Sequence, residues 1–414
     1  MSAALTEEVV GPARGERPRY PELTGLRAAA ATAVVLTHAA FWTGSTGDTP
    51  LGRAFARFDV GVALFFVLSG FLLARPLFQA AATGAPRPRV AAYLWRRALR
   101  VLPAYWLTVA AALLLLPDNR GASASTWVRH LLLLPVYDGK GFAEGLSQTW
   151  SLSTEVAFYA VLPLLAAGLV RLSRGRRNGP WRPSRALAGL AALTVAGELW
   201  IAGVWSGIVG TGSYAQWLPS YLGWFGAGMA LAVLTASDPA GAPVRLARTL
   251  GSSLGTCWAA AAVLFWLSCS PLGGPLGLDV PDAGTAVTKN LLYLGVALLL
   301  VLPLVFGRPG EGTTRRVLAS PLVTWLGEIS YGLFLVHLVV LFGLLELLGS
   351  SPLAGSLVVL GLLTWTGGVL VAALVRWAVE LPAARLRAIV PERRATAGDT
   401  NPAASAATAT TPST

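Results

Sequence analysis

The segment 26–42, LRAAAATAVVLTHAAFW, is apolar apart from two threonines, Arg27 and His38. It is long enough to cross a bilayer as a helix, which takes about 17–25 residues. Eleven helical steps of about 100° end within about 20° of the starting face, so Arg27 and His38 point the same way, about 16 Å apart along the axis. An arginine in hydrocarbon costs on the order of 2.5–3.5 kcal/mol and usually faces a water-filled or ligand-filled interior. The pair therefore predicts a site inside a membrane protein.

The composition of the whole chain agrees with a membrane protein. Its 414 residues are 54% hydrophobic and 13% charged, whereas about a quarter of the residues of an ordinary soluble domain are charged. This predicts an all-α, polytopic membrane helix bundle of about ten transmembrane helices. The expected spans lie near 26–42, 59–79, 94–116, 152–170, 187–205, 215–234, 251–268, 286–306, 322–347 and 354–379. We expect one membrane domain at 23–390, a cytoplasmic segment at 1–22 and a disordered cytoplasmic tail at 391–414.

The basic residues predict the orientation of the bundle. Of the 32 arginines and lysines, 25 lie in the N-terminus, in alternate connections and in the C-terminal tail, which places both termini in the cytoplasm of a protein of the cell membrane. Because the basic residues sit between apolar runs and no stacking-aromatic motif accompanies them, we expect no nucleic-acid partner despite the net charge of +12. The longest exterior connection, 117–149, is expected to cap the bundle. Only two of the 32 are lysines, a usage that favours a bacterial origin.

An arginine block begins the third span. Arg96 or Arg97 shares a helix face with Arg100, at a spacing of four or three residues, so that two guanidinium groups could hold phosphates bidentately. The competing interpretation is ordinary anchoring at the cytoplasmic side, which needs charge but no fixed spacing. The same block would also bind anionic headgroups of membrane lipids.

A carboxylate lies at the start of the fourth span, within the sequence WSLSTE of residues 150–155. Glu155 could face the bundle interior and orient an imidazole, raising its basicity. Alternatively, Ser151 or Ser153 could cap the helix with Glu155 nearby. The sequence leaves both readings open.

The ninth span carries Glu328, Tyr331 and His337 in an otherwise apolar run. A spacing of three residues puts Glu328 near Tyr331. His337 could line the same cavity or bond a neighbouring helix, and we favour the second. Glu198 and Glu346 are further carboxylates within spans, which are functional candidates by default.

Several motifs in order resemble a known family. They are Arg27-x10-His38, residues 61–71 (GVALFFVLSGF), Arg97 and Arg100 with Pro103 and Tyr105, residues 150–155 (WSLSTE), and Ile329-Ser330-Tyr331 with His337. Over about residues 20–345 the chain resembles the acyltransferase-3 family of integral-membrane O-acyltransferases. The resemblance implies ten core helices, an acyl-coenzyme A donor that approaches from the cytoplasm, and a hydroxylated acceptor that is a sugar or natural product.

The resemblance also assigns residues. It implies that His38 is the essential histidine, Arg27 its partner and Glu155 the carboxylate of the tryptophan-serine motif, with Arg96, Arg97 and Arg100 on the donor. Further pocket candidates are Ser69, Trp150, Tyr159, Tyr331 and His337. No metal is expected.

The chain departs from the family pattern at Thr24, Ala63 and Val156-Ala157, where carboxylates or Glu-Gln are usual. These losses favour a less polar acceptor such as a macrolide. The expected reaction is direct transfer, with His38 as general base, or transfer through an acyl-histidine. The rival class is a proton-coupled transporter or flippase, since buried Arg, His and Glu would serve it too. No inverted repeat, the usual mark of a carrier, is evident in the hydropathy.

Overall fold

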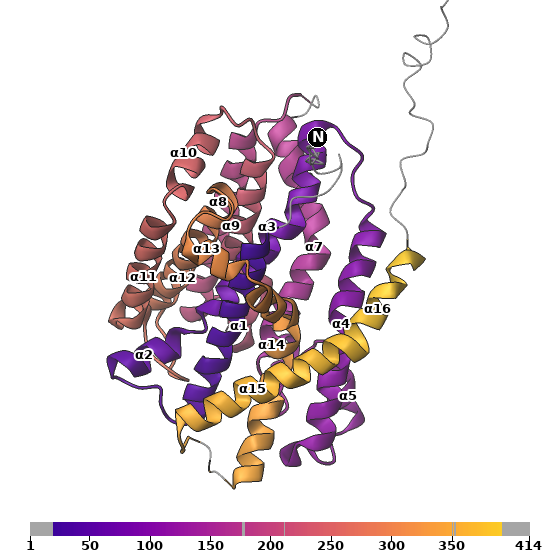
Figure 1. The fold of residues 1–414 in the computed structure, drawn as a ribbon, viewed down its shortest axis with the longest axis vertical. Helices are drawn as coiled ribbons and strands as arrows, with labels where there is room; N and C mark the ends of the chain where they lie inside the picture. Colours follow the sequence, from indigo (N-terminus) through magenta and orange to yellow (C-terminus); the bar gives the residue numbers. More distant parts are fainter. Residues whose placement is uncertain (1–19, 176–178, 211, 350, 352, 391–414) are drawn as a thin grey trace, which may run out of the picture.

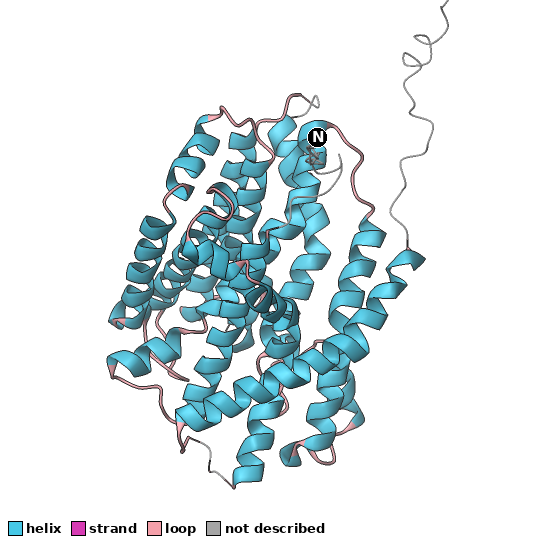
Figure 2. Ribbon diagram, in the orientation of Figure 1, coloured by secondary structure: helices cyan, strands magenta, loops and turns pink. Residues whose placement is uncertain are grey.

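The described part of the chain is entirely helical. The computed structural model describes residues 20–390 apart from 176–178, 211, 350 and 352, and these residues contain helices and loops but no strand (Figure 2). Most of the predicted 1–22 segment and the whole predicted 391–414 tail lie outside the described residues. Nine helices in the described part are long and apolar enough to cross a membrane. The predicted all-α polytopic bundle is confirmed.

The helices of the bundle form up to ten spans. Eight are the long helices α1 (Pro21–Trp42), α3 (Val60–Thr83), α4 (Val90–Leu115), α7 (Thr149–Arg174), α8 (Pro183–Trp205), α12 (Ala283–Phe306), α14 (Pro321–Leu348) and α15 (Leu357–Val375). The ninth is α9 (Leu222–Thr235), which reaches 18 residues together with the preceding turn η3 (Leu218–Tyr221). The predicted span 251–268 is a 16-residue helix, α11 (Leu254–Cys269), and makes a tenth span only with α10 (Ala242–Gly251), from which it is bent by 84°. The break falls at Gly251-Ser252-Ser253, residues of low helix propensity.

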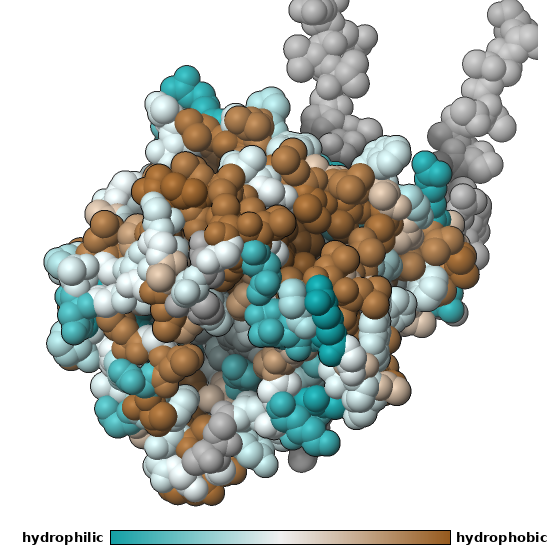
Figure 3. Space-filling model, turned by 90° about the horizontal axis from the view of Figure 1, so that it is seen from below, coloured by the Kyte–Doolittle hydropathy of each residue, from teal (hydrophilic) through white to brown (hydrophobic). Residues whose placement is uncertain are grey.

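The outer surface of the bundle suits contact with lipid. Large apolar side chains such as Leu114, Leu164 and Leu370 are each at least two-thirds exposed. Seen from below, apolar residues form a broad patch along one side of the molecule, whereas polar residues gather around a recess in the middle of the lower end (Figure 3). This distribution fits a protein whose sides face hydrocarbon and whose ends face water.

Glycines set how closely the central helices approach. A Cβ at Gly70 of α3 would lie 2.2 Å from the Phe225 carbonyl oxygen of α9, and one at Gly228 of α9 would lie 2.0 Å from the Val67 oxygen. Helix α1 meets α14 in the same way, because a Cβ at Gly327 would lie 1.9 Å from the Thr24 oxygen. Such backbone contact is the usual basis of helix association in membranes. It gathers α1, α3 and α14 in the middle of the bundle (Figure 1).

Replacing Gly228 by alanine should destabilise the bundle, because the methyl group has no space against the α3 backbone. Overpacking of this kind costs about 1–3 kcal/mol, and we expect a lower melting temperature in detergent. Gly343→Ala is the matched control, since nothing lies within 4 Å of a Cβ at that helical glycine. Equal melting temperatures for both variants would contradict the packing argument.

The connection 117–148 folds over the lower end of the bundle. It contains η1 (Pro117–Asn119), α5 (Ala124–Leu131) and α6 (Pro135–Asp138), none of them long enough to cross the membrane. His130 holds the connection together: its Nδ1 lies 2.8 Å from the Thr126 oxygen, and its Nε2 accepts a 3.0 Å hydrogen bond from the Ala143 amide. The Tyr105 hydroxyl of α4 donates to the His130 carbonyl oxygen. The imidazole thus holds the connection together, while hydrogen bonds from Tyr105 and Trp106 to backbone oxygens of α5 tie it to α4.

The His130 contacts predict a loss of stability in acid. Burial lowers the pKa of this imidazole below its ordinary value, so the folded state binds a proton less readily than the unfolded state. The stabilising contribution is complete above the ordinary pKa of about 6.5 and is lost as the pH falls below it. We expect the melting temperature to fall between pH 7 and pH 5, and to fall less in His130→Gln, whose amide oxygen accepts without titrating. Parallel pH profiles for the two proteins would refute the assignment.

Candidate functional site

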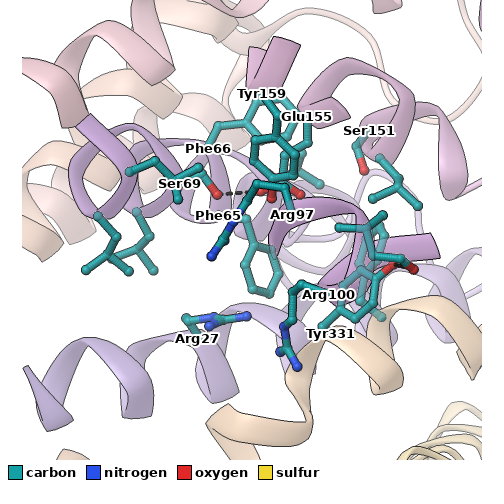
Figure 4. Close-up of a pocket in the computed structure, with 17 residues that line it drawn as sticks. Arg27, Phe65, Phe66, Ser69, Arg97, Arg100, Ser151, Glu155, Tyr159 and Tyr331 are labelled. Carbon is teal, nitrogen blue, oxygen red and sulfur yellow. Dashed lines mark hydrogen bonds between the residues drawn. The ribbon is translucent and has the colours of Figure 1, made fainter. Parts of the chain in front are cut away.

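A pocket lies between α1, α3, α4, α7 and α14 (Figure 4). Its apolar wall includes Phe65, Phe66 and Phe334. Its polar lining residues are Arg27, Ser69, Arg97, Arg100, Ser151, Glu155, Tyr159 and Tyr331. The structure therefore brings together, from five helices, most of the residues that the sequence singled out.

Three guanidinium groups face this pocket, and within the described part of the chain two of them lack a hydrogen bond or ion pair. Arg100 forms an ion pair with Glu380 and lies 5.4 Å from the ring centroid of Tyr331. Arg97 lies 6.0 Å from the Tyr159 centroid, and its Nε is buried without a hydrogen bond. Among the described residues, neither Arg27 nor Arg97 has a hydrogen bond or ion-pair partner. Buried charges are normally paired, so the two arginines mark a place for an anion.

The arginine block divides between two faces of α4. Arg97 and Arg100, three residues apart, line the pocket, whereas Arg96 is absent from its lining. Of the two pairings that the sequence left open, the structure brings Arg97 and Arg100 together. The fixed spacing goes beyond what charge anchoring alone requires.

Glu155 faces the pocket and does not cap α7. The helix begins at Thr149, so Glu155 lies beyond its first turn, and no side chain caps its N-terminus. Ser151 and Ser153 donate instead to backbone carbonyls. The Ser69 hydroxyl donates to the Glu155 carboxylate (Figure 4). The capping interpretation is therefore wrong, because the helix starts earlier than the apolar run suggested.

His38 is paired with His337 rather than with Glu155. The His337 Nε2 lies 3.1 Å from the His38 Nδ1, and the ring centroids are 5.0 Å apart. Within the described residues no hydrogen bond joins Glu155 to either histidine. His337 does bond a neighbouring helix, as favoured from the sequence, and the residue it meets there is His38.

The histidine pair lies beyond the inner wall of the pocket. Neither ring is among the lining residues, but Phe334 lines the pocket and its ring centroid is 6.0 Å from that of His337. Phe65, also in the wall, lies 6.1 Å from Phe334. Phe334 therefore connects the pocket wall to the histidine pair, and neither phenylalanine was named as a site candidate from the sequence.

Trp150 and Glu328 do not line the pocket. Trp150 packs 5.4 Å from the ring of Tyr221. Glu328 pairs with Arg376, while the Tyr331 hydroxyl donates to the Val101 oxygen at 2.8 Å. Glu380, which meets Arg100, was missed because the expected last span ended one residue before it; a carboxylate directly after a long apolar run was the available signal.

The fold and the pocket define a membrane-embedded helical protein with an internal cationic site, and the comparisons with known proteins give its family. The chain belongs to the acyltransferase-3 family, whose acyltransferase domain matches residues 20–380. It is therefore a multi-pass membrane acyltransferase, and the transporter alternative loses its support.

Two relatives match part of the chain. Nodulation protein 10 of Rhizobium leguminosarum bv. viciae is 27% identical over 165 residues, which is 34% of this chain and 42% of the relative. Acyltransferase MdmB of Streptomyces mycarofaciens is 31% identical over 157 residues, 35% of this chain and 39% of the relative. Each match thus spans about two fifths of the relative. No solved structure matches the chain.

Proposed function

We propose that this protein transfers an acetyl or other short acyl group from acyl-coenzyme A to a hydroxyl of a macrolide-like natural product or a sugar. It does so in the cell membrane, with both termini in the cytoplasm. The proposal is carried by Arg27 and Arg97, which have no hydrogen bond or ion pair among the described residues and line a pocket with Phe334, whose ring lies 6.0 Å from that of His337. A long, thin donor with phosphates at one end and a thioester at the other matches this arrangement.

The donor phosphates are assigned to the arginine end of the pocket. Guanidinium groups form bidentate hydrogen bonds with phosphate oxygens, and Arg27 and Arg97 have donors free for them. Arg100 shares its charge with Glu380 and closes the same side. The eleven residues from Arg27 to His38 span about 16 Å of α1, a distance that an extended pantetheine arm covers. Arg96, which does not line the pocket, is assigned to the membrane surface and not to the donor.

The chemistry is assigned to His38. The imidazole takes the proton of the acceptor hydroxyl, the oxygen attacks the thioester carbonyl, and the carbon–sulfur bond breaks. The thiolate then recovers the proton from the imidazolium and leaves as coenzyme A. An acyl-histidine intermediate is the alternative course, and trapped label on His38 would distinguish it.

The acceptor class rests on less than the donor class. Thr24 and Ala63, at which the family usually has carboxylates, are not among the pocket-lining residues, so their loss does not make this pocket less polar. The similarity to an acyltransferase of Streptomyces mycarofaciens supports acyl transfer and favours neither a natural product nor a sugar as acceptor. A macrolide and a methyl glycoside are therefore both needed as test acceptors.

Neutralising the unpaired arginines should weaken donor binding. We expect Arg27→Gln and Arg97→Gln each to raise the Kd for coenzyme A by about 10-fold, measured by calorimetry in detergent, because each loses a charge-assisted contact with phosphate. Arg96→Gln is the matched control on the same helix and should bind as the wild type does. An equal loss in all three variants would point to general surface charge.

Replacing His38 should abolish transfer without affecting the fold. With radiolabelled acetyl-coenzyme A and either test acceptor, we expect His38→Ala to lower kcat by about 10²- to 10⁴-fold, the usual contribution of a general base. Its affinity for coenzyme A and its melting temperature should stay near the wild-type values. Full ester formation by this variant would remove His38 from the mechanism.

A further inference from the structure

We propose that His337 is a positioning residue for His38: it accepts a hydrogen bond from the His38 Nδ1–H, fixes the tautomer whose Nε2 lone pair is free, and shares the charge when His38 is protonated. This inference rests on the proposed role of His38 as general base. It names the residue that prepares that base, where the sequence had suggested a carboxylate.

The hydrogen bonds around the two rings allow one neutral arrangement. The His337 Nδ1 lies 2.7 Å from the Phe334 carbonyl oxygen, and the His38 Nδ1 lies 2.9 Å from the Val34 oxygen. Carbonyl oxygens only accept, so both Nδ1 atoms carry hydrogen. The His337 Nε2 is then an acceptor, and the one hydrogen of the His38 Nδ1 is shared between the Val34 oxygen and the His337 Nε2 across the 3.1 Å contact. That leaves the His38 Nε2 as the unprotonated nitrogen.

The reverse tautomer would place two unprotonated acceptors together. If the His38 Nδ1 had no hydrogen, its lone pair would face the Val34 oxygen at 2.9 Å. A hydrogen on the His337 Nε2 could fill the contact between the rings, but His337 would then be charged or would lose its bond to Phe334. His337 is completely buried, where a charge without a counterion is costly. The geometry therefore selects the first arrangement.

The packing of the two helices fixes this contact. A Cβ at Gly327 of α14 would lie 1.9 Å from the Thr24 oxygen of α1, and one at Gly25 of α1 would lie 2.1 Å from the Leu318 oxygen. The backbones of α1 and α14 are therefore in direct contact. Gln148 donates a 2.6 Å hydrogen bond to the Leu335 oxygen, two residues from His337. The acceptor nitrogen is thus held on a rigid element, as preorganised catalysis requires.

The proton balance of the transfer step follows from this arrangement. The hydroxyl proton of the acceptor moves to the His38 Nε2, while the Nδ1–H keeps its bond to the His337 Nε2. The positive charge then extends over two rings instead of one, and it is removed when the Nε2 proton passes to the departing thiolate. A neutral imidazole here performs the orienting role that a carboxylate performs in a Ser-His-Asp triad.

Two substitutions separate positioning from packing. His337→Phe keeps a ring but removes the acceptor, and we expect kcat to fall at least 10-fold while KM for acetyl-coenzyme A changes less than twofold. His337→Gln places an amide oxygen near the position of Nε2, and should restore kcat to within about fivefold of the wild type. His130→Gln, which alters the histidine of the cap, is the matched control and should transfer normally at pH 8.

The activity data could overturn the proposal in two ways. Wild-type kcat in His337→Phe would show that the bond is unnecessary. Equal losses of kcat in the Phe and Gln variants, accompanied by equal losses of melting temperature, would show that His337 only packs.

A spectroscopic measurement tests the pair independently of turnover. The chain has three histidines, so ¹⁵N-histidine spectra can be assigned with the variants above. We expect the His38 Nδ1 to be protonated and its Nε2 unprotonated in the wild type, with this preference reduced in His337→Phe. A protonated Nε2 in the wild type would overturn the proposal. The expected spectrum in a protein that acylates neither test acceptor would instead uphold the pair and reject the proposed function.

Discussion

The backbone contact of α1 with its neighbours is the constraint on which the site depends. With Gly327 against the Thr24 backbone and Gly61 against that of Ala30, α1 has no freedom to turn its polar face toward lipid. Its two polar groups are then directed to different places, Arg27 to the pocket and His38 to the ring of His337. The glycines that fix the packing of α1 therefore determine where Arg27 and His38 lie.

The electrostatics of the pocket follow from an uneven pairing of its charges. Arg100 is compensated by Glu380 and Glu155 is bound by Ser69, whereas Arg27 and Arg97 keep their donors free. A protein that needed only stability would pair or remove such cations, because their desolvation is costly. Retaining them is reasonable where an anionic substrate completes the pairing, as in the function proposed above.

The sequence predicted the helical architecture, because long apolar runs are a local property. The cost of burying charge drew attention to Arg27 and Glu155, whereas Ser69 and Tyr159 were suggested by the family resemblance. It could not show that His38 meets His337, 299 residues away, because this contact depends on how α1 lies against α14. It missed Glu380 because this residue lies just outside an expected span. It assigned no role to Phe65 and Phe334 because an apolar side chain in a membrane helix does not stand out from its neighbours. The α10–α11 bend lies at the start of the expected span 251–268, and α10 falls in the basic connection before it.

The π-helical turn Arg376–Glu380 at the end of α15 joins the C-terminal end of the bundle to two helices that line the pocket. Its first residue binds Glu328 of α14 and its last binds Arg100 of α4. A π turn accommodates one residue more than the α-helical repeat, so both ends meet their partners only while that extra residue is kept. Deleting one residue of the turn would rotate the residues after it by about 100° and break the ion pair of Glu380 with Arg100. The pocket would then contain a third uncompensated cation, although the deletion lies outside the pocket lining.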